Sequence, residues 1–210
     1  EKNEEGPESE NNEPVTNLDW NLVWSDEFDG TSLDQSKWNI LRWRPGWVNN
    51  ELQAYTARDS NIYLEDGSLI LRALIEPGYF DSDYQGNSYS ADYTSGRINT
   101  AGKFSPTYGR MDIRAKLPKG RGSWPAIWML GENISTVGWP NCGEIDIMEH
   151  VGFDSEIIHG SIHTEDFNHM NNTQKSGSTI VSSATDSFHV YSLEWTPDYS
   201  GLNPAYYLVE

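Results

Sequence analysis

Three acidic residues fall within the short stretch Gly143–His150, where they alternate with apolar side chains. On a β-strand successive side chains point to opposite faces, so Glu144 and Asp146 share one face. Glu149 falls on the other face unless one extra residue forms a β-bulge after Asp146, and Met148 is the natural candidate. With that bulge, three carboxyl groups line one surface. Two carboxyl groups held close together, one as nucleophile and one as proton donor, are what retaining hydrolysis of a glycosidic bond requires.

A solvated outer strand face is the simpler explanation of these acids. Like charges on neighbouring positions of one face repel, however, and one carboxyl group is then expected to have a raised pKa. Folding stability gains nothing from that repulsion, so a functional role is favoured. A helix would scatter the same three residues around its axis, because successive residues turn by about 100°. The stretch is therefore predicted to be a strand.

Cysteine and histidine residues near this stretch could carry chemistry of another kind. Cys142 stands two positions before Glu144. A nucleophilic thiol needs an ordered histidine partner, however, and the neighbouring sequence shows no motif for one. A single cysteine also excludes an internal disulfide bond. His159 and His163 are four residues apart, as zinc ligands on a helix would be. The glycine between them favours a strand, on which one histidine would bind a sugar hydroxyl or a carboxylate.

Tryptophan residues offer a surface for sugar rings. Trp124 and Trp128 are four residues apart and would share a strand face, either as a stacking platform beside the acids or as core residues. Trp43, Trp47 and Trp139 lie in loops rich in Pro and Gly, where packing is a weaker explanation for a large aromatic side chain.

The composition favours one all-β domain. The 210 residues include 18 Gly, 9 Trp and 11 Tyr, and no long apolar stretch has a helical period. A disordered acidic linker is predicted over residues 1–17, with the folded domain over 18–210. The net charge of −18 argues against nucleic acid and sulfated polymers and is compatible with neutral sugars. No apolar run is long enough for a transmembrane helix.

Short strand-like segments separated by turn residues must position the acids. They cover residues 69–75, 95–100, 109–117, 124–130, 144–151, 156–163 and 188–195. With no helix between them, they are expected to pair antiparallel in a β-sandwich. Residues 79–93 and 164–185 are expected to be long polar loops. The acids scattered through the first of these loops are expected to be a solvated surface rather than a calcium site.

The acidic stretch, Glu144-Ile-Asp-Ile-Met-Glu149, has the form E-x-D-x-x-E with the bulge residue present. Together with segments such as Trp24-Ser-Asp-Glu-Phe-Asp-Gly30 and Trp124-Pro-Ala-Ile-Trp-Met-Leu130, it resembles glycoside hydrolase family 16, in the laminarinase branch of endo-β-1,3-glucanases. Further similar segments follow in family order at residues 49–56, 95–98, 108–110, 114–118 and 188–196. The resemblance implies a β-jelly-roll sandwich of two antiparallel sheets, with the acids on the concave face of a cleft.

The resemblance also implies roles for individual residues. Glu144 would be the nucleophile, Glu149 the general acid/base, and Asp146 a hydrogen-bond partner that helps to set the protonation of Glu144. The mechanism implied is double displacement with retention of the anomeric configuration. The cleft residues that hold glucose units would be Asn50, Arg97, Trp124, Trp128, Trp139 and His163.

Family members usually continue well past the segment Glu194-Trp-Thr-Pro197, so the catalytic domain over 18–210 is expected to be C-terminally incomplete. Many relatives bind a structural calcium ion through a Glu at the position of Glu27, backbone carbonyl groups and a late Asp. Glu27 is present, whereas the late Asp is expected in the missing region. The chemistry itself requires no cofactor.

The leading hypothesis is a monomeric endo-β-1,3-glucanase acting on laminarin-type polysaccharide outside the cytoplasm, whether extracellular, periplasmic or tethered to a bacterial surface. Hydrolysis of mixed-linkage β-glucan or of an algal galactan is the alternative within the family. Lichenase-type relatives typically lack the bulge residue, so Met148 argues against the mixed-linkage alternative. A non-catalytic glucan-binding module is an alternative of another class, although such relatives have typically lost a catalytic glutamate and both are present here.

Overall fold

The computed structural model describes residues 19–196 and 206–208, so the linker predicted over residues 1–17 lies outside the described residues. The chain divides into two compact units. Unit 2 comprises Leu22–Pro106, and unit 1 comprises the chain from Thr107 onward together with the residues before Leu22. Both units are built from β-strands, as predicted. Within the described residues the one helix is α1 (Ile134–Val137), and no helix is long and apolar enough to span a membrane.

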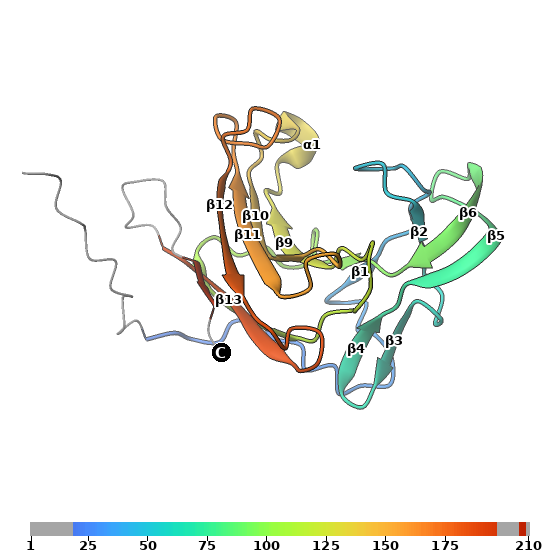
Figure 1. Ribbon diagram of the computed structural model, residues 1–210, viewed down its shortest axis with the longest axis horizontal. Helices are drawn as coiled ribbons and strands as arrows, with labels where there is room; N and C mark the ends of the chain where they lie inside the picture. Colours follow the sequence, from blue (N-terminus) through green and yellow to red (C-terminus); the bar gives the residue numbers. More distant parts are fainter. Residues whose placement is uncertain (1–18, 197–205, 209–210) are drawn as a thin grey trace, which may run out of the picture. The chain divides into compact units, whose positions relative to one another are not determined.

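In unit 1 the acid-bearing strand lies inside a four-stranded antiparallel sheet with the order β12-β11-β10-β9 (Figure 1). The strands are β9 (Ala126–Leu130), β10 (Glu144–His150), β11 (Ile157–His163) and β12 (Lys175–Ile180). The helix α1 belongs to the connection between β9 and β10. β10 is therefore supported by hydrogen-bonded neighbours on both edges, which fixes the spacing of its side chains.

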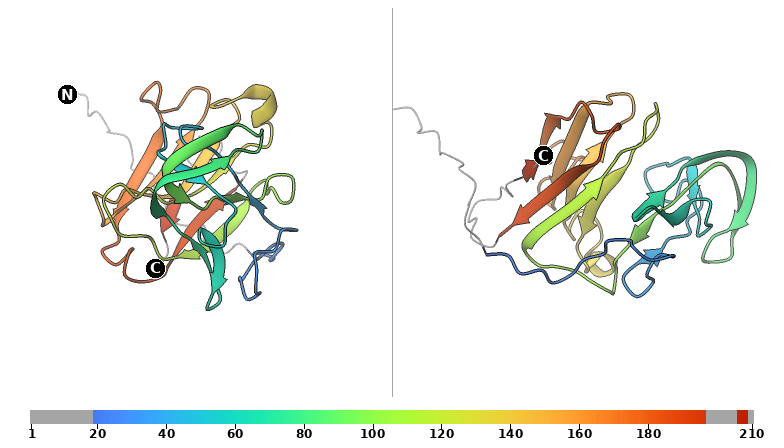
Figure 2. Two further views of the ribbon diagram at one scale, coloured as in Figure 1. Left: turned by 90° about the vertical axis from the view of Figure 1, so that its right-hand side faces the viewer. Right: turned by 90° about the horizontal axis from the view of Figure 1, so that it is seen from below.

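A second antiparallel sheet of unit 1 has the order β14-β13-β8, in which β8 and β13 run side by side (Figure 2). Its strands are β8 (Gly109–Ala115), β13 (His189–Trp195) and β14 (Tyr206–Leu208). The apolar faces of the two sheets share one core cluster. The buried members of this cluster are Leu117, Ile147, Met148, Ile158, Ala184, Tyr191 and Leu193.

The predicted bulge interrupts β10 after Asp146. Against β9, Asp146 pairs with Trp128 and Met148 pairs with the next residue of β9, so Ile147 has no partner. Against β11, Asp146 pairs with Ser161 and Glu149 with His159, so neither Ile147 nor Met148 has a partner there. The bulge predicted between Asp146 and Glu149 is confirmed, and on the β9 side the unpaired residue is Ile147 rather than Met148. Ile147 is 6% exposed and Met148 is 1% exposed. Because both side chains enter the core, the next residue, Glu149, returns to the face of Asp146.

Unit 2 contains three small sheets. In two of them a pair of strands is joined: β1 (Asn39–Ile40) with β7 (Ile98–Asn99), and β3 (Ile62–Glu65) with β4 (Ser68–Leu71). The third has the order β2-β6-β5, formed by β2 (Gln53–Tyr55), β6 (Ser88–Ser95) and β5 (Leu74–Ser82). β5 and β6 form a long curved ribbon (Figures 1 and 2).

Several strand expectations were wrong in detail. Residues 69–75 divide between β4 and β5, and residues 95–100 divide at Gly96, where a Cβ atom would lie 2.7 Å from Asn61 O. Residues 79–93 form strands on both sides of a turn rather than a loop, and residues 164–185 include β12. β2 pairs with β6 in parallel, and α1 was not expected. For the strands, backbone pairing with a neighbouring strand, which side-chain alternation does not report, decides the structure.

Candidate active site

The three acids of β10 occupy one face of the four-stranded sheet, opposite the core. Asp146 is 4% exposed, and Glu144 and Glu149 are half-buried. Directly paired residues of antiparallel strands place their side chains on the same face. The pairs made by Glu144, Asp146 and Glu149 with β11 involve His163, Ser161 and His159, in that order. The acid-bearing face is therefore continued by polar side chains on the neighbouring strand.

Burial and mutual repulsion keep a proton within this carboxyl cluster. Burial, reinforced by the negative charges of Glu144 and Glu149, raises the pKa of Asp146 to about 8. Burial also raises the pKa of Glu144, although the nearby Trp139 N–H and a hydrogen bond from Asp146 oppose that rise. Near neutral pH Asp146 is therefore protonated, and its hydrogen bond to Glu144 favours the ionised form of Glu144. The sequence-based expectation of a raised carboxyl pKa is confirmed.

Trp139 and two histidines form an aromatic wall beside Glu144. The ring centroid of Trp139 lies 5.8 Å from that of His163 and 4.7 Å from that of His169, and the two histidine rings are 5.2 Å apart. The Trp139 N–H lies close enough to lower the pKa of Glu144, without reaching full hydrogen-bond geometry to any acceptor in the described residues. This donor is therefore available to a ligand beside Glu144.

His163 also reaches the middle acid of the cluster. Its Nε2 lies 3.3 Å from Asp146 Oδ2. Burial lowers the pKa of His163, and the neighbouring His169 lowers it further, so the imidazole is neutral near pH 7. A neutral imidazole beside a protonated carboxyl group adds no net charge to the site. His163, predicted as a cleft residue, thus contacts the acid cluster.

Sequence reasoning gave no role to His169, which is exposed in the connection between β11 and β12. This connection is braced by Asn168, which is 1% exposed and whose side-chain amide donates to the carbonyl oxygens of Thr164 and Glu165. No spacing in the sequence indicates the position of His169, because it depends on the path of the connection. The bracing holds the His169 ring against Trp139.

The two tryptophans predicted to share the acid-bearing face do flank the acids. Trp128 pairs with Asp146 across β9 and β10. Trp124 precedes β9, and its Nε1 donates to Glu149 Oε1 at 3.0 Å. Trp124 is 68% exposed, which excludes the alternative that it is a core residue. Its ring is held by the hydrogen bond yet remains open to a ligand.

Asn50, Arg97 and Glu27 belong to unit 2, so their contribution to the acid-bearing face of unit 1 stays a prediction. The Arg97 guanidinium carbon lies 4.4 Å from the ring centroid of Trp43, and its Nη1 lies 4.0 Å from Glu51 Oε1. Asn50 is exposed and has a positive φ of 54°. Glu27 is exposed, and the calcium ion predicted at this position also stays a prediction.

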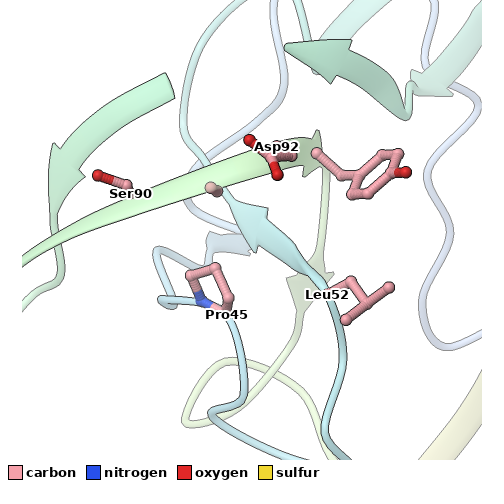
Figure 3. Close-up of a pocket in the computed structure, with 6 residues that line it drawn as sticks. Pro45, Leu52, Ser90 and Asp92 are labelled. Carbon is pink, nitrogen blue, oxygen red and sulfur yellow. The ribbon is translucent and has the colours of Figure 1, made fainter. Parts of the chain in front are cut away.

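Unit 2 also contains a separate pocket of about 350 Å³ (Figure 3). Its walls are formed by Pro45, Leu52, Ser90, Ala91, Asp92 and Tyr93. Asp92, the one acidic residue of the lining, accepts a hydrogen bond from the Gly78 backbone N–H at 3.1 Å. This pocket lacks the paired carboxyl groups that distinguish β10. The acid cluster is therefore the better candidate for an active site.

The spacing of Glu144, Asp146 and His163 would also suit a metal ion. Each offers one ligand atom, and these atoms lie within 4.8 Å of one another. Metal binding requires deprotonated carboxylates, whereas Asp146 holds its proton up to a pKa of about 8. A metal ion bound there would displace this proton, so the same three residues would suit either a proton-sharing carboxyl cluster or a metal ion.

Comparisons with known proteins agree on one family. Residues 49–201 match the profile of "Glycosyl hydrolases family 16". A β-glucanase of Rhodothermus marinus is 51% identical over 183 residues, which make up 85% of this chain and 60% of that protein. This chain therefore spans less than two thirds of the length of that relative.

Two solved structures extend the likeness to the fold. The laminarinase catalytic domain of Thermotoga maritima MSB8 aligns with a TM-score of 0.75 and 42% identity, covering 86% of this chain and 72% of that chain. A variant of SCLam, a non-specific endo-β-1,3(4)-glucanase, aligns with a TM-score of 0.78 and 44% identity, covering 86% and 69% of the two chains. That variant was co-crystallised with 1,3-β-D-cellotriosyl-glucose.

Proposed function

The chain belongs to glycosyl hydrolases family 16, and from this premise we propose that it is a retaining endo-hydrolase of β-1,3-glucan. Glu144 is the nucleophile and Glu149 the general acid and base in this proposal. The observation that carries it is the set of three carboxyl groups on one face of β10, inside the matched residues 49–201. The likeness to a laminarinase domain supports β-1,3-glucan as the substrate and a jelly-roll cleft as its binding surface.

In the first step Glu149 gives its proton to the glycosidic oxygen while the Glu144 carboxylate attacks the anomeric carbon. The bond to the leaving sugar breaks, and a glycosyl ester of Glu144 forms. In the second step Glu149 takes a proton from water, whose oxygen attacks the same carbon. The ester bond breaks, the electron pair returns to Glu144, and two inversions give net retention.

Asp146 positions the nucleophile in this scheme. Because its pKa is about 8, it donates a hydrogen bond to Glu144 near neutral pH and leaves the charge on the group that must attack. A second ionised carboxylate beside Glu144 would be strongly unfavourable in this buried setting. The Trp139 N–H and the neutral His163 are proposed to hold hydroxyl groups of the sugar bonded to Glu144.

Mixed-linkage β-1,3-1,4-glucan is the second candidate substrate, because SCLam is described as acting on both linkage types. Parallel incubations with laminarin, lichenan and agarose separate the candidates by the release of reducing ends. Release from laminarin, at a rate equal to or above that from lichenan, is the expected result. Release from agarose alone would refute the proposal. The acidic N-terminal segment and a polymeric substrate favour action outside the cytoplasm.

Azide rescue assigns the two glutamates separately. Glu144→Ala with an aryl β-laminaribioside should be inactive, and azide should restore turnover by attack from the side that the carboxylate vacated, giving the α-glycosyl azide. Glu149→Ala should still form the ester, because an activated aryl group leaves without acid help, and azide should give the β-glycosyl azide. Glu156→Gln, a change of an exposed glutamate outside the cluster, is the control and should keep parent activity. The same anomer from both alanine variants would overturn the assignment.

A further inference from the structure

The Arg97 side chain lies against Trp43, Tyr55 and Glu51. Its guanidinium carbon is 4.4 Å from the ring centroid of Trp43 and 5.4 Å from that of Tyr55, and its Nη1 is 4.0 Å from Glu51 Oε1. Trp43 and Tyr55 are themselves joined by two backbone hydrogen bonds, of 3.1 and 2.9 Å. The place of the guanidinium group therefore depends on how firmly Tyr55 and the backbone that leads to Arg97 are held.

A group of buried polar side chains lies behind Tyr55, on the opposite face of β2 and β6. These strands run in parallel, with Ala54 paired to Thr94. Successive side chains of a strand point to opposite faces, so Thr56, the residue after Tyr55, shares the face of Thr94. Thr56 and Thr94 are 1% and 0% exposed, and their hydroxyl oxygens accept hydrogen bonds from the Arg58 guanidinium group at 3.4 and 3.1 Å.

Arg58 ties these two threonines to β5 through Glu76. Its guanidinium group donates to both oxygens of the Glu76 carboxylate, to Oε1 from Nη1 at 3.1 Å and to Oε2 from Nη2. Glu76 also accepts a hydrogen bond from the hydroxyl group of Thr94. The bonds from Arg58 and Thr94 lower the pKa of Glu76, so its carboxylate is ionised at neutral pH. A paired bond between a guanidinium group and a carboxylate has a defined geometry, which makes it the rigid part of this polar network.

Asn61 extends the polar network to the residue before Arg97. Asn61 is fully buried, its side-chain amide donates to Thr94 Oγ1 at 3.0 Å, and its Oδ1 accepts from Arg58 at 3.0 Å. A Cβ atom at Gly96 would lie 2.7 Å from Asn61 O, so the backbone of Gly96 rests directly against Asn61. The polar network thus supports both β2, which carries the ring beside the guanidinium group, and the chain that enters Arg97.

We propose that Arg58 and Glu76 are positioning residues that hold Arg97 in the orientation that binds a glucose unit of the substrate. The inference rests on the proposed function, for which Arg97 is a predicted glucan-binding residue. Arg58 and Glu76 act through the backbone: without their paired bond the two threonines lose their common partner, and Tyr55 and Gly96 shift with them. A hydrogen bond weakens steeply as its angle closes, so a small rotation of the guanidinium group is enough to weaken binding.

A double-mutant cycle between Glu76 and Arg97 tests this coupling. The values of kcat and KM on laminarin are measured by reducing-end release for the full chain, Glu76→Gln, Arg97→Ala and the double variant, with thermal scans to show that each is folded. Glu76→Gln keeps the shape of the side chain and removes its charge, so KM should rise about fivefold, as for one weakened hydrogen bond. The value of kcat should stay nearly unchanged, because binding lost equally from the ground and transition states changes KM alone. The double variant should have the KM of Arg97→Ala, because no guanidinium group remains to be positioned.

Two further variants complete the test. Arg58→Lys keeps the positive charge but cannot form the paired bond, so it tests the polar network even if Glu76→Gln fails to fold, and its KM should rise severalfold. Glu194→Gln is the matched control, because Glu194 accepts a hydrogen bond from Arg110 Nη1 at 3.0 Å in unit 1, and it should keep the parent KM.

An additive cycle would overturn the inference: if Glu76→Gln raises KM by the same factor with and without Arg97, then Glu76 acts independently of Arg97. Parent-like KM values in folded Glu76→Gln and Arg58→Lys would also overturn it, and so would a parent-like KM in Arg97→Ala. A parent chain that releases no reducing ends from laminarin would instead refute the proposed function itself.

Discussion

Replacing Asp146 by Asn should stabilise the protein at neutral pH and leave it unchanged in acid. Asn has nearly the shape of a protonated Asp, and its amide can still donate to Glu144. It cannot ionise, however, so it removes the cost of keeping a proton on a carboxyl group that is 4% exposed beside two glutamates. The substitution thus removes the electrostatic cost of the site while it leaves the packing of the side chain nearly unchanged.

The size of the effect follows from the pKa of Asp146. An unfolded aspartate releases its proton near pH 3.8, whereas native Asp146 holds it up to about pH 8. Between these values the native state binds a proton that the unfolded state has lost, so the free energy of unfolding falls as pH rises. This loss of stability is absent below pH 3.8 and reaches its full size above about pH 8. At pH 7 the protein is about three pH units above the unfolded value of 3.8. At about 1.36 kcal/mol per unit, holding the proton lowers the free energy of unfolding by about 4 kcal/mol, a cost that Asp146 shares with Glu144.

Thermal unfolding of parent and Asp146→Asn at several pH values, with EDTA present, measures this difference. At roughly 2–4 °C per kcal/mol for a chain of this size, the variant should melt about 10 °C higher at pH 7 and nearly together with the parent at pH 4. Asp154→Asn, at an exposed position, is the matched control and should track the parent at every pH. An Asp146→Asn variant that is less stable than the parent at pH 7, or equally shifted at pH 4 and pH 7, would refute the reasoning.

Three further substitutions probe the surroundings of the acids. His169→Ala removes the ring that lies tilted against the Trp139 indole beside the nucleophile, so KM for laminarin should rise several-fold. Because the position is exposed, the melting temperature should stay within about 2 °C in thermal scans. Trp124→Phe removes the donor to Glu149 but keeps an aromatic ring, and kcat/KM should fall by about tenfold in reducing-end assays. Gly131→Ala places a Cβ 2.1 Å from a backbone carbonyl oxygen in the connection before β10 and should cost about 1–3 kcal/mol in urea unfolding. Gly177→Ala, which meets no atom within 4 Å, is its control and should leave the urea midpoint nearly unchanged.

The acid-bearing strand was predictable because its acidic residues and its apolar residues both repeat every two positions. Apolar and acidic residues alternate up to Asp146, and the one break in the pattern could be resolved only by a bulge. The likeness of most of the chain to laminarinases, also inferred from the sequence, is confirmed by the comparisons.

The edge strand β12 was missed because nothing in its side chains marks it as a strand. All six residues of Lys175–Ile180 are exposed, and the strand exists through its backbone pairing with β11. An edge strand that buries no apolar face has no hydrophobic period to detect. The position of His169 was equally hidden, because a loop residue meets its neighbours through the path of the backbone and not through any sequence spacing.

The bulge explains why the core and the acids of β10 depend on each other. Ile147 and Met148 point in succession into the core, at 6% and 1% exposure, and this double burial is what turns Glu149 back to the face of Asp146. Core packing on one side of the strand therefore fixes the spacing of the carboxyl groups on the other side. A bulge whose residues were exposed could shift along the strand at little cost, whereas moving this one would expel a large apolar side chain from the core. The geometry of the acids is thus set by apolar burial, which opposes the electrostatic repulsion that would otherwise separate them.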